Sequence, residues 1–120
     1  MKAKKIIVIG GVASGPAAVA EARRTDSEAE ITIVEMGPDI SYSACEMPLY
    51  VSGEIANSER LVRYPVAKFK EHFSSNVLTH HEAESIDVQK RVVTVRDLAT
   101  QRVRDLSYDK LILATGSGAV

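Results

Sequence analysis

Cysteine is nearly absent from this chain, since Cys45 is the only one among 120 residues. A single cysteine cannot form an internal disulfide, and no set of Cys and His residues has the spacing of a metal site. We therefore expect no metal centre and a reducing, cytoplasmic environment. An excess of basic residues is also missing, because 15 Lys and Arg are balanced by 16 Asp and Glu. Nucleic-acid-binding domains usually carry a basic face, so the charge disfavours that class of function.

Long hydrophobic runs are missing as well. The apolar stretch at residues 6–9 is far shorter than the about 20 residues that span a bilayer, so we expect no membrane span. The same stretch runs directly into glycines, which is unlike a signal peptide. Repeats, low-complexity segments and internal linkers are absent too, and the length suits one domain around a single core.

Short runs of β-branched and other apolar residues predict a parallel sheet. Residues 4–10, 30–35 and 110–116 have the continuous apolar pattern of strands that are buried on both faces. An alanine-rich helix is predicted between the first two, with Pro16 in its first turn. This β-α-β order implies a parallel sheet with a right-handed crossover, so the fold class is α/β and Rossmann-like.

The middle of the chain predicts further elements. We expect a short helix at 45–51, an amphipathic helix at 65–73 and one or two strands within 76–88. Alternating apolar and polar residues predict an antiparallel β-hairpin at about 91–107. The sequence stops just after an apolar strand, which normally continues into structure that covers it. We therefore expect the chain to be part of a longer protein.

The sequence GGVASG at residues 10–15 lies between the first predicted strand and its helix. This is the setting of a dinucleotide-binding loop, in which the helix N-terminus presents free N–H groups to a pyrophosphate. Glu35 ends the second strand, 20 residues after Gly15, where its carboxylate can bind ribose hydroxyls and would repel a 2′-phosphate. The pattern favours FAD or NAD over NADP. Because Val12 replaces the middle glycine of G-x-G-x-x-G, a glycine-rich turn without a ligand stays open.

Four stretches resemble, in order, the single-cysteine branch of the FAD-dependent pyridine nucleotide-disulfide oxidoreductases. This branch includes coenzyme A disulfide reductases and NADH oxidases, and members near the coenzyme A disulfide reductases often carry a valine after two glycines. The stretches are IIVIGGVASGPAAVAEARR (6–24), ISYSACEMPLYVSGEI (40–55), LVRYPVAKFKEHF with VLTHHEAESID (61–87), and YDKLILATGS (108–117). The resemblance implies that residues 1–120 are the N-terminal portion of an FAD-binding domain. It also implies that the full-length protein has an NADH domain and a dimerisation domain, and forms a homodimer.

The resemblance further implies a role for each matching residue. Glu35 and the backbone at Met36 would hold the adenosine ribose of FAD, and the backbone at Ala83 would meet the adenine. The residues implied at the pyrophosphate are Gly10, Val12, Ala13, Ser14 and Gly15, and those implied to close over the cofactor are Ala114, Thr115 and Gly116. Arg24 and Ser41 fall where coenzyme A disulfide reductases touch their substrate.

Cys45 would be the redox cysteine beside the flavin. Its thiolate would attack a small-molecule disulfide, such as coenzyme A disulfide or a polysulfide, with electrons supplied by NADH or NADPH through FAD. An alternative within the family is an NADH oxidase or peroxidase that cycles Cys45 through a sulfenic acid. A third alternative is a nucleotide-binding module without catalysis. The 120-residue chain alone is expected to be inactive, because the NADH domain lies outside it.

His80 and His81 are candidates for metal binding or catalysis, because they are adjacent histidines. They are adjacent, so on a strand they would point to opposite faces, with one exposed to solvent. No cysteine or carboxylate pattern completes a metal site around them, and we assign them no role.

Overall fold

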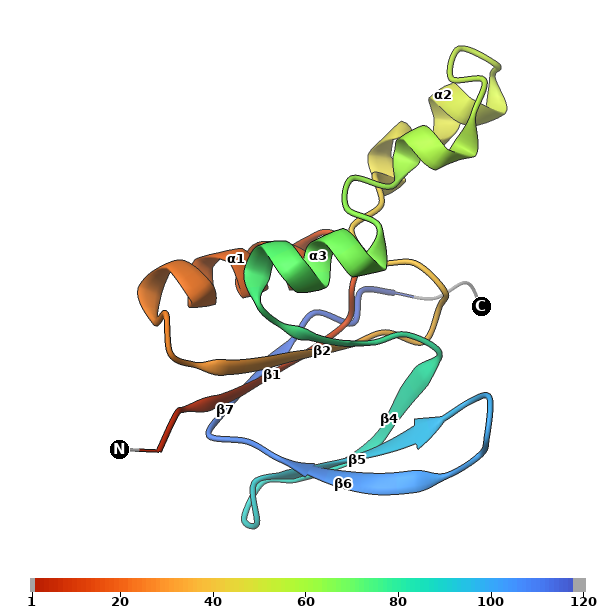
Figure 1. Cartoon of the computed structure of the whole chain (residues 1–120). Helices are drawn as coiled ribbons and strands as arrows, with labels where there is room; N and C mark the ends of the chain where they lie inside the picture. The colour runs from red at the N-terminus through yellow and green to blue at the C-terminus, as the bar shows by residue number, and fades with distance from the viewer. Residues whose placement is uncertain (1, 118–120) are drawn as a thin grey trace.

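Two helices, a parallel sheet and an antiparallel sheet lie in layers in the computed structural model of this chain, which describes residues 2–117 (Figure 1). The first and last residues of the predicted 1–120 domain, Met1 and Gly118–Val120, lie outside the described residues. The α/β, Rossmann-like fold class predicted from the sequence is confirmed by this arrangement.

The parallel sheet has the strand order β3-β2-β1-β7, with every neighbouring pair parallel. Its strands are β1 (Lys5–Ile9), β2 (Glu30–Val34), β3 (Asn76–Leu78) and β7 (Lys110–Leu113). Strand β1 lies between β2 and β7, so Ile9 is paired with both Val34 and Leu113. The carboxyl ends of these strands therefore meet at one edge of the sheet, and the loops that follow β1, β2 and β7 are brought together there.

The predicted hairpin is present, and a third strand extends it to a sheet. Strands β5 (Val92–Asp97) and β6 (Val103–Ser107) form the antiparallel hairpin, and β4 (His81–Asp87) pairs with the other side of β5. The stretch 76–88 thus contains two strands in different sheets. The break falls at His80, whose positive φ of 54° turns the chain and whose N–H donates to the carbonyl of Gly37 at 3.1 Å.

The central sheet is buried on both faces, which explains its continuous apolar strands. On one face, Ile6, Val8, Ile31 and Ile33 pack against the helices, where Phe69 is fully buried. On the other face, a second cluster joins the parallel sheet to the antiparallel sheet; its members are Ile7, Ile9, Val34, Val93 and Val95. Alternate residues of each central strand therefore pack in different hydrophobic clusters, one on each face of the sheet.

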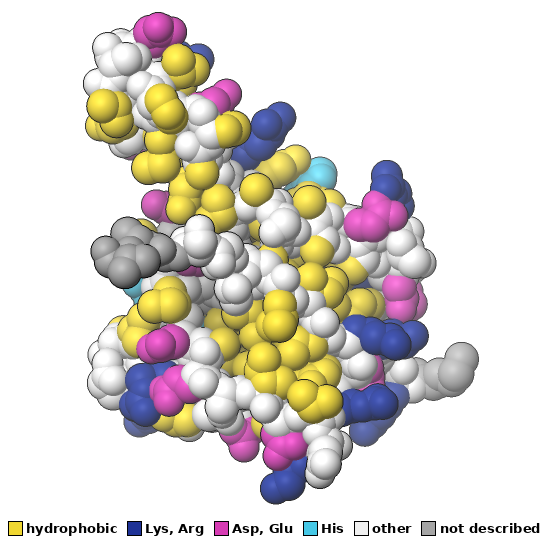
Figure 2. Space-filling model, turned by 180° about the vertical axis from the view of Figure 1, so that it is seen from behind, with side chains coloured by type: hydrophobic (Ala, Val, Ile, Leu, Met, Phe, Trp, Pro, Cys, Tyr) yellow, Lys and Arg dark blue, Asp and Glu magenta, His cyan; other side chains and the backbone are white. Residues whose placement is uncertain are grey.

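The segment that carries Cys45 projects from the body as an arm (Figure 1). It consists of the 3-10 turn η1 (Ala44–Glu46), helix α2 (Met47–Val51) and the 3-10 turn η2 (Ser58–Leu61). The prediction of a single helix at 45–51 is wrong at its start: the α-helix begins at Met47, and Cys45 lies in the preceding 3-10 turn. Figure 2 shows hydrophobic side chains along this arm. Of the residues in α2, Met47, Leu49, Tyr50 and Val51 are exposed.

Helices α1 (Ser14–Thr25) and α3 (Val66–Phe73) cover one face of the parallel sheet. Arg23 joins their C-terminal ends. Its guanidinium donates to the carbonyl oxygens of Phe73 at 2.9 Å and Ser74 at 2.9 Å, and also to those of Asp26 and Ser27. One side chain thus satisfies carbonyls at the ends of both helices, which would otherwise lack partners.

Replacing Arg23 by glutamine is expected to lower the free energy of unfolding by about 2 kcal/mol, because hydrogen bonds from a charged donor to four carbonyls are lost. Arg24→Gln is the matched control, since exposed Arg24 pairs only with exposed Glu21. Its expected effect is below about 0.5 kcal/mol. Urea unfolding followed by circular dichroism measures both variants, and equal losses would contradict this assignment.

Candidate nucleotide and thiol site

At two positions of the glycine-rich loop between β1 and α1, neighbouring backbone atoms leave no room for a side chain. Gly10 has a φ of +109°, and a Cβ there would lie 1.9 Å from the carbonyl oxygen of Ala114 after β7. A Cβ on Gly15 would lie 1.7 Å from the carbonyl oxygen of Gly10. The glycines therefore allow the loop to approach β7 and allow α1 to start directly against the loop. These are the roles predicted for a tight turn and for close packing of helix on strand.

The middle of the loop leaves backbone donors available. Among the residues that the structure describes, none accepts a hydrogen bond from the N–H of Val12 or Ala13, and no side chain caps the start of α1. In contrast, the N–H of Gly10 donates to Val34 at 2.8 Å. Available N–H groups at a helix N-terminus are the usual partners of a phosphate, so the loop has the donors that a pyrophosphate requires.

Glu35 holds the loop from the end of β2. One carboxylate oxygen accepts from the N–H of Gly11 at 2.8 Å, and the other accepts from the N–H of Gly37 at 2.7 Å. This bridging contact was not foreseen from the sequence, which predicted only ribose binding. A carboxylate has about four acceptor positions, so two remain for hydroxyl groups. Glu35 can thus shape the loop and bind a diol together.

A cavity of about 170 Å³ collects most of the residues predicted around the adenosine. Of the predicted residues, Gly10, Glu35, Met36, Ala83 and Thr115 line it. His81, to which the sequence analysis assigned no role, and Glu82, which it did not single out, line it as well. Strand β4 supplies Ala83 because the chain turns at His80 and the N–H of His81 donates to the carbonyl of Glu35 at 3.0 Å. The strand that begins the antiparallel sheet is therefore tied directly to the end of β2.

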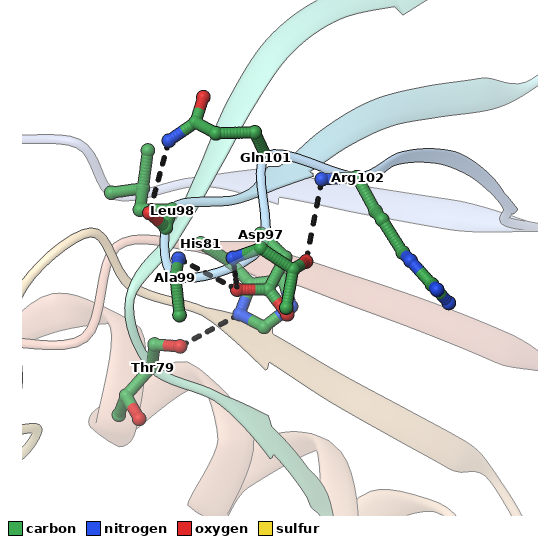
Figure 3. A network of polar contacts seen from close by, with 8 residues as sticks. Thr79, His81, Asp97, Leu98, Ala99, Gln101 and Arg102 are labelled. Atoms are coloured by element: carbon green, nitrogen blue, oxygen red, sulfur yellow. Dashed lines mark hydrogen bonds and ion pairs between the residues drawn. The ribbon is translucent and has the colours of Figure 1, made fainter.

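His81 is partly buried, and its imidazole lies close to Thr79 and Asp97 (Figure 3). Its Nδ1 lies 2.7 Å from the carbonyl oxygen of Thr79, and its Nε2 lies 3.9 Å from the carboxylate of Asp97. The backbone N–H of Ala99 donates to Asp97 and is the main cause that lowers the pKa of this carboxyl below its ordinary value. His80 is exposed, as predicted for one of the two histidines.

Cys45 is exposed and lies on the wall of a larger cavity of about 530 Å³. Val12 and Ala13 of the glycine loop line the same cavity, and so does Ser41. Helix α1 adds Pro16, Ala17 and Ala20, and the opposite wall is formed by Tyr64, Phe69 and Phe73. The structure therefore brings the predicted redox cysteine, one predicted substrate residue and the predicted phosphate-binding loop to one apolar cavity.

The residues before Cys45 are fixed to the body by backbone contacts. Ser41 is buried with a positive φ of 57°, and its N–H donates to the carbonyl of Gly11 at 2.7 Å. Its own carbonyl accepts from the N–H of Arg63 at 2.8 Å, and Tyr42 pairs with Val62. The chain leading into Cys45 is thus held between the glycine loop and the segment that enters α3.

Five predicted site residues line neither cavity: Ser14, Gly15, Arg24, Ala114 and Gly116. The backbone carbonyl of Ala114 instead lies close to Gly10, and Ser14 is the first residue of α1. Arg24 is exposed near the end of α1, four residues beyond Ala20, so it follows the cavity wall along the same face of the helix. Its side chain pairs with Glu21.

The comparisons with known proteins agree with this geometry. The family model described as pyridine nucleotide-disulphide oxidoreductase matches residues 4–120. The chain belongs to the pyridine nucleotide-disulphide oxidoreductase family. A coenzyme A disulfide reductase of Staphylococcus haemolyticus is 40% identical over 118 residues, which cover 97% of this chain and 26% of that protein.

Two solved structures of the oxidoreductase type are similar in fold. The reduced CoADR-RHD of Bacillus anthracis has a TM-score of 0.95 at 31% identity, covering 100% of this chain and 22% of that chain. A water-forming NADH oxidase from Lactobacillus brevis, solved with NADH, has a TM-score of 0.91 at 29% identity and covers 98% and 26%. The chain therefore spans about a quarter of the length of these oxidoreductases.

The family is one of FAD-dependent flavoproteins that use a nicotinamide nucleotide, which confirms the cofactor class expected from the sequence. Within residues 2–117, no helix is both long and apolar enough to cross a membrane.

Proposed function

We propose that this chain is the N-terminal portion of the FAD-binding domain of an NAD(P)H-dependent disulfide reductase, with Cys45 as the redox cysteine. The observation that carries the proposal is the position of Cys45. Its side chain lines the same apolar cavity as Val12 and Ala13, two residues of the loop whose backbone donors suit a pyrophosphate. A thiol, a nucleotide loop and room for a substrate are thus combined in one place.

The residues fit FAD in two parts. Val12 and Ala13 offer backbone N–H groups for the pyrophosphate, at the start of α1. Glu35 would accept from ribose hydroxyls, with Met36, Ala83 and Thr115 beside the adenosine in the smaller cavity. Gly15 and Ala114 lie against Gly10 of this loop, and the assignment of Ser14 and Gly116 to the cofactor rests on the sequence resemblance. FAD supplies, when bound, the electrons that it receives from NADH or NADPH.

The proposed reaction needs only the sulfur of Cys45 and these electrons. The Cys45 thiolate attacks one sulfur of the disulfide, an S–S bond forms with Cys45, and the other half leaves as a thiolate. Two electrons and one proton then cleave the mixed disulfide, releasing the second half as a thiol and restoring the Cys45 thiolate. The apolar walls of the larger cavity would hold the bound half while this second step takes place.

An oxidase or peroxidase that uses a Cys45 sulfenate is the competing function, and one of the similar structures is an NADH oxidase. The apolar cavity of about 530 Å³ favours disulfide reduction, because oxygen and peroxide need no such volume.

The test is NADH or NADPH oxidation by the full-length protein without oxygen. We expect rapid turnover with coenzyme A disulfide and slow turnover when only oxygen or hydrogen peroxide is supplied. Oxidation that needs oxygen or peroxide and ignores disulfides would establish the competing function instead. Sedimentation of the same preparation tests the proposed homodimer.

A further inference from the structure

We infer that Arg63 selects the substrate, by binding a negatively charged group on the half of the disulfide that becomes attached to Cys45. The inference rests on the proposed disulfide reductase function and adds a residue that no sequence pattern indicated. It concerns the larger cavity of about 530 Å³, which Cys45 and Arg63 both line.

Arg63 is the one side chain with a permanent charge among the described residues that line this cavity. Besides Arg63 and Cys45, the walls consist of valine, alanine, proline, serine and aromatic residues, with hydroxyl groups on Ser41, Ser43, Tyr42 and Tyr64. A cavity of this composition accepts an arm that is mainly uncharged. The lone guanidinium then determines which end group such an arm can carry, because it pairs favourably with a phosphate or carboxylate and repels an ammonium.

The position of Arg63 relative to Cys45 is fixed by the backbone. The N–H of Arg63 donates to Ser41 at 2.8 Å, and the N–H of Ser43 donates to Leu61 at 2.7 Å. These two contacts flank the pairing of Tyr42 with Val62. Cys45 follows two residues after Ser43, so the backbone segments that carry the cation and the thiol are joined in one short two-chain structure.

The guanidinium of Arg63 is available to a ligand. Its side chain makes none of the ion pairs and none of the side-chain hydrogen bonds found among residues 2–117. By contrast, the guanidinium of Arg23 is held at the ends of two helices, and that of Arg96 pairs with Glu84. Glu46, next to Cys45, does not line the cavity, so no described carboxylate of the wall competes for Arg63.

The experiment compares two disulfides with the same arm in the full-length protein. Coenzyme A disulfide carries phosphates, whereas pantethine has the same pantetheine arm without any phosphate. Arg63→Gln is expected to raise the KM for coenzyme A disulfide about fivefold with little change in kcat. A fivefold change in KM corresponds to the free energy that an exposed ion pair contributes. The KM for pantethine is expected to stay unchanged, and Arg63→Lys is expected to keep most of the preference. Arg60→Gln, in η2 and outside the cavity wall, is the matched control.

The outcomes separate a failure of this inference from a failure of the proposed function. Equal effects of Arg63→Gln on both disulfides, or no effect on either, would overturn the role of Arg63 even though disulfide reduction stands. If the unaltered protein reduces neither disulfide, the proposed function fails, and equilibrium binding of coenzyme A to the same variants becomes the readout. A fivefold weaker affinity in Arg63→Gln would then support the anion site, and an unchanged affinity would overturn it.

Discussion

Replacing Cys45 by serine in the full-length protein is expected to lower the rate of disulfide reduction by about a thousandfold or more, with FAD still bound. A serine hydroxyl neither ionises near neutral pH nor forms a bond that two electrons can cleave, so both proposed steps are lost. The fold should tolerate the change, because Cys45 is exposed in the arm and belongs to neither core cluster. Anaerobic NADH oxidation measures the rate, and the visible absorption spectrum measures the flavin.

Ser43→Ala provides the matched control for this variant. Ser43 lines the same cavity two residues away and offers a hydroxyl, but no sulfur. We expect it to keep most of the activity. Disulfide reduction that persists in Cys45→Ser would remove Cys45 from the mechanism. Loss of flavin in Cys45→Ser would instead make the cysteine a structural part of the FAD site.

The nucleotide loop was predictable from sequence because its signals are local. Gly10 must be glycine because it lies against Ala114 after β7, and Gly15 must be glycine because it lies against Gly10. The strand–loop–helix pattern indicates both glycines without knowledge of the remaining fold. Glu35 was singled out in the same way, from its distance along the chain, and its binding to ribose stays a prediction. Its bridge from Gly11 to Gly37 was not predicted, because it depends on the path of the chain after β2.

The substrate side of the site was harder to predict because it depends on contacts between distant segments. Arg63 and Tyr64 reach the cavity only because residues 41–43 run beside residues 61–63, and this pairing begins at Ser41 with its positive φ. Serine at such a backbone angle carries no sequence signature. His81 was set aside on the assumption of a regular strand, whereas the turn at His80 places His81 at the start of β4.

The helix predicted to begin at Cys45 shows a second limit of local patterns. Pro48 indicates the first turn of a helix, and α2 does begin beside it, at Met47. The residues before it close a 3-10 turn instead, with the N–H of Glu46 donating to Ser43 at 3.2 Å. Helix α2 is only 5 residues long, so the rigidity of the cysteine segment comes from its backbone pairing with residues 61–63 and not from a helix.

Replacing Gly15 by alanine is expected to remove bound FAD from the full-length protein, lowering its FAD content by about tenfold or more. The new Cβ would lie 1.7 Å from the carbonyl oxygen of Gly10, and this atom cannot move aside as a flexible side chain could. Helix α1 would have to shift away from Gly10. The shift would displace the N–H groups of Val12 and Ala13, which lie just before the helix. We expect a loss of about 3 kcal/mol in the free energy of unfolding, similar to severe overpacking of a core.

Gly37→Ala is the matched control for Gly15→Ala. A Cβ on Gly37 would have one near neighbour, a carboxylate oxygen of Glu35 at 3.3 Å, which belongs to a side chain and can give way. Its N–H would still donate to Glu35, so FAD content and stability should stay close to those of the unaltered protein. Flavin absorbance and thermal unfolding measure both variants. A Gly15→Ala protein that binds FAD normally would show that α1 can move without disturbing the pyrophosphate site, and the assignment of this loop to FAD would then lose its structural basis.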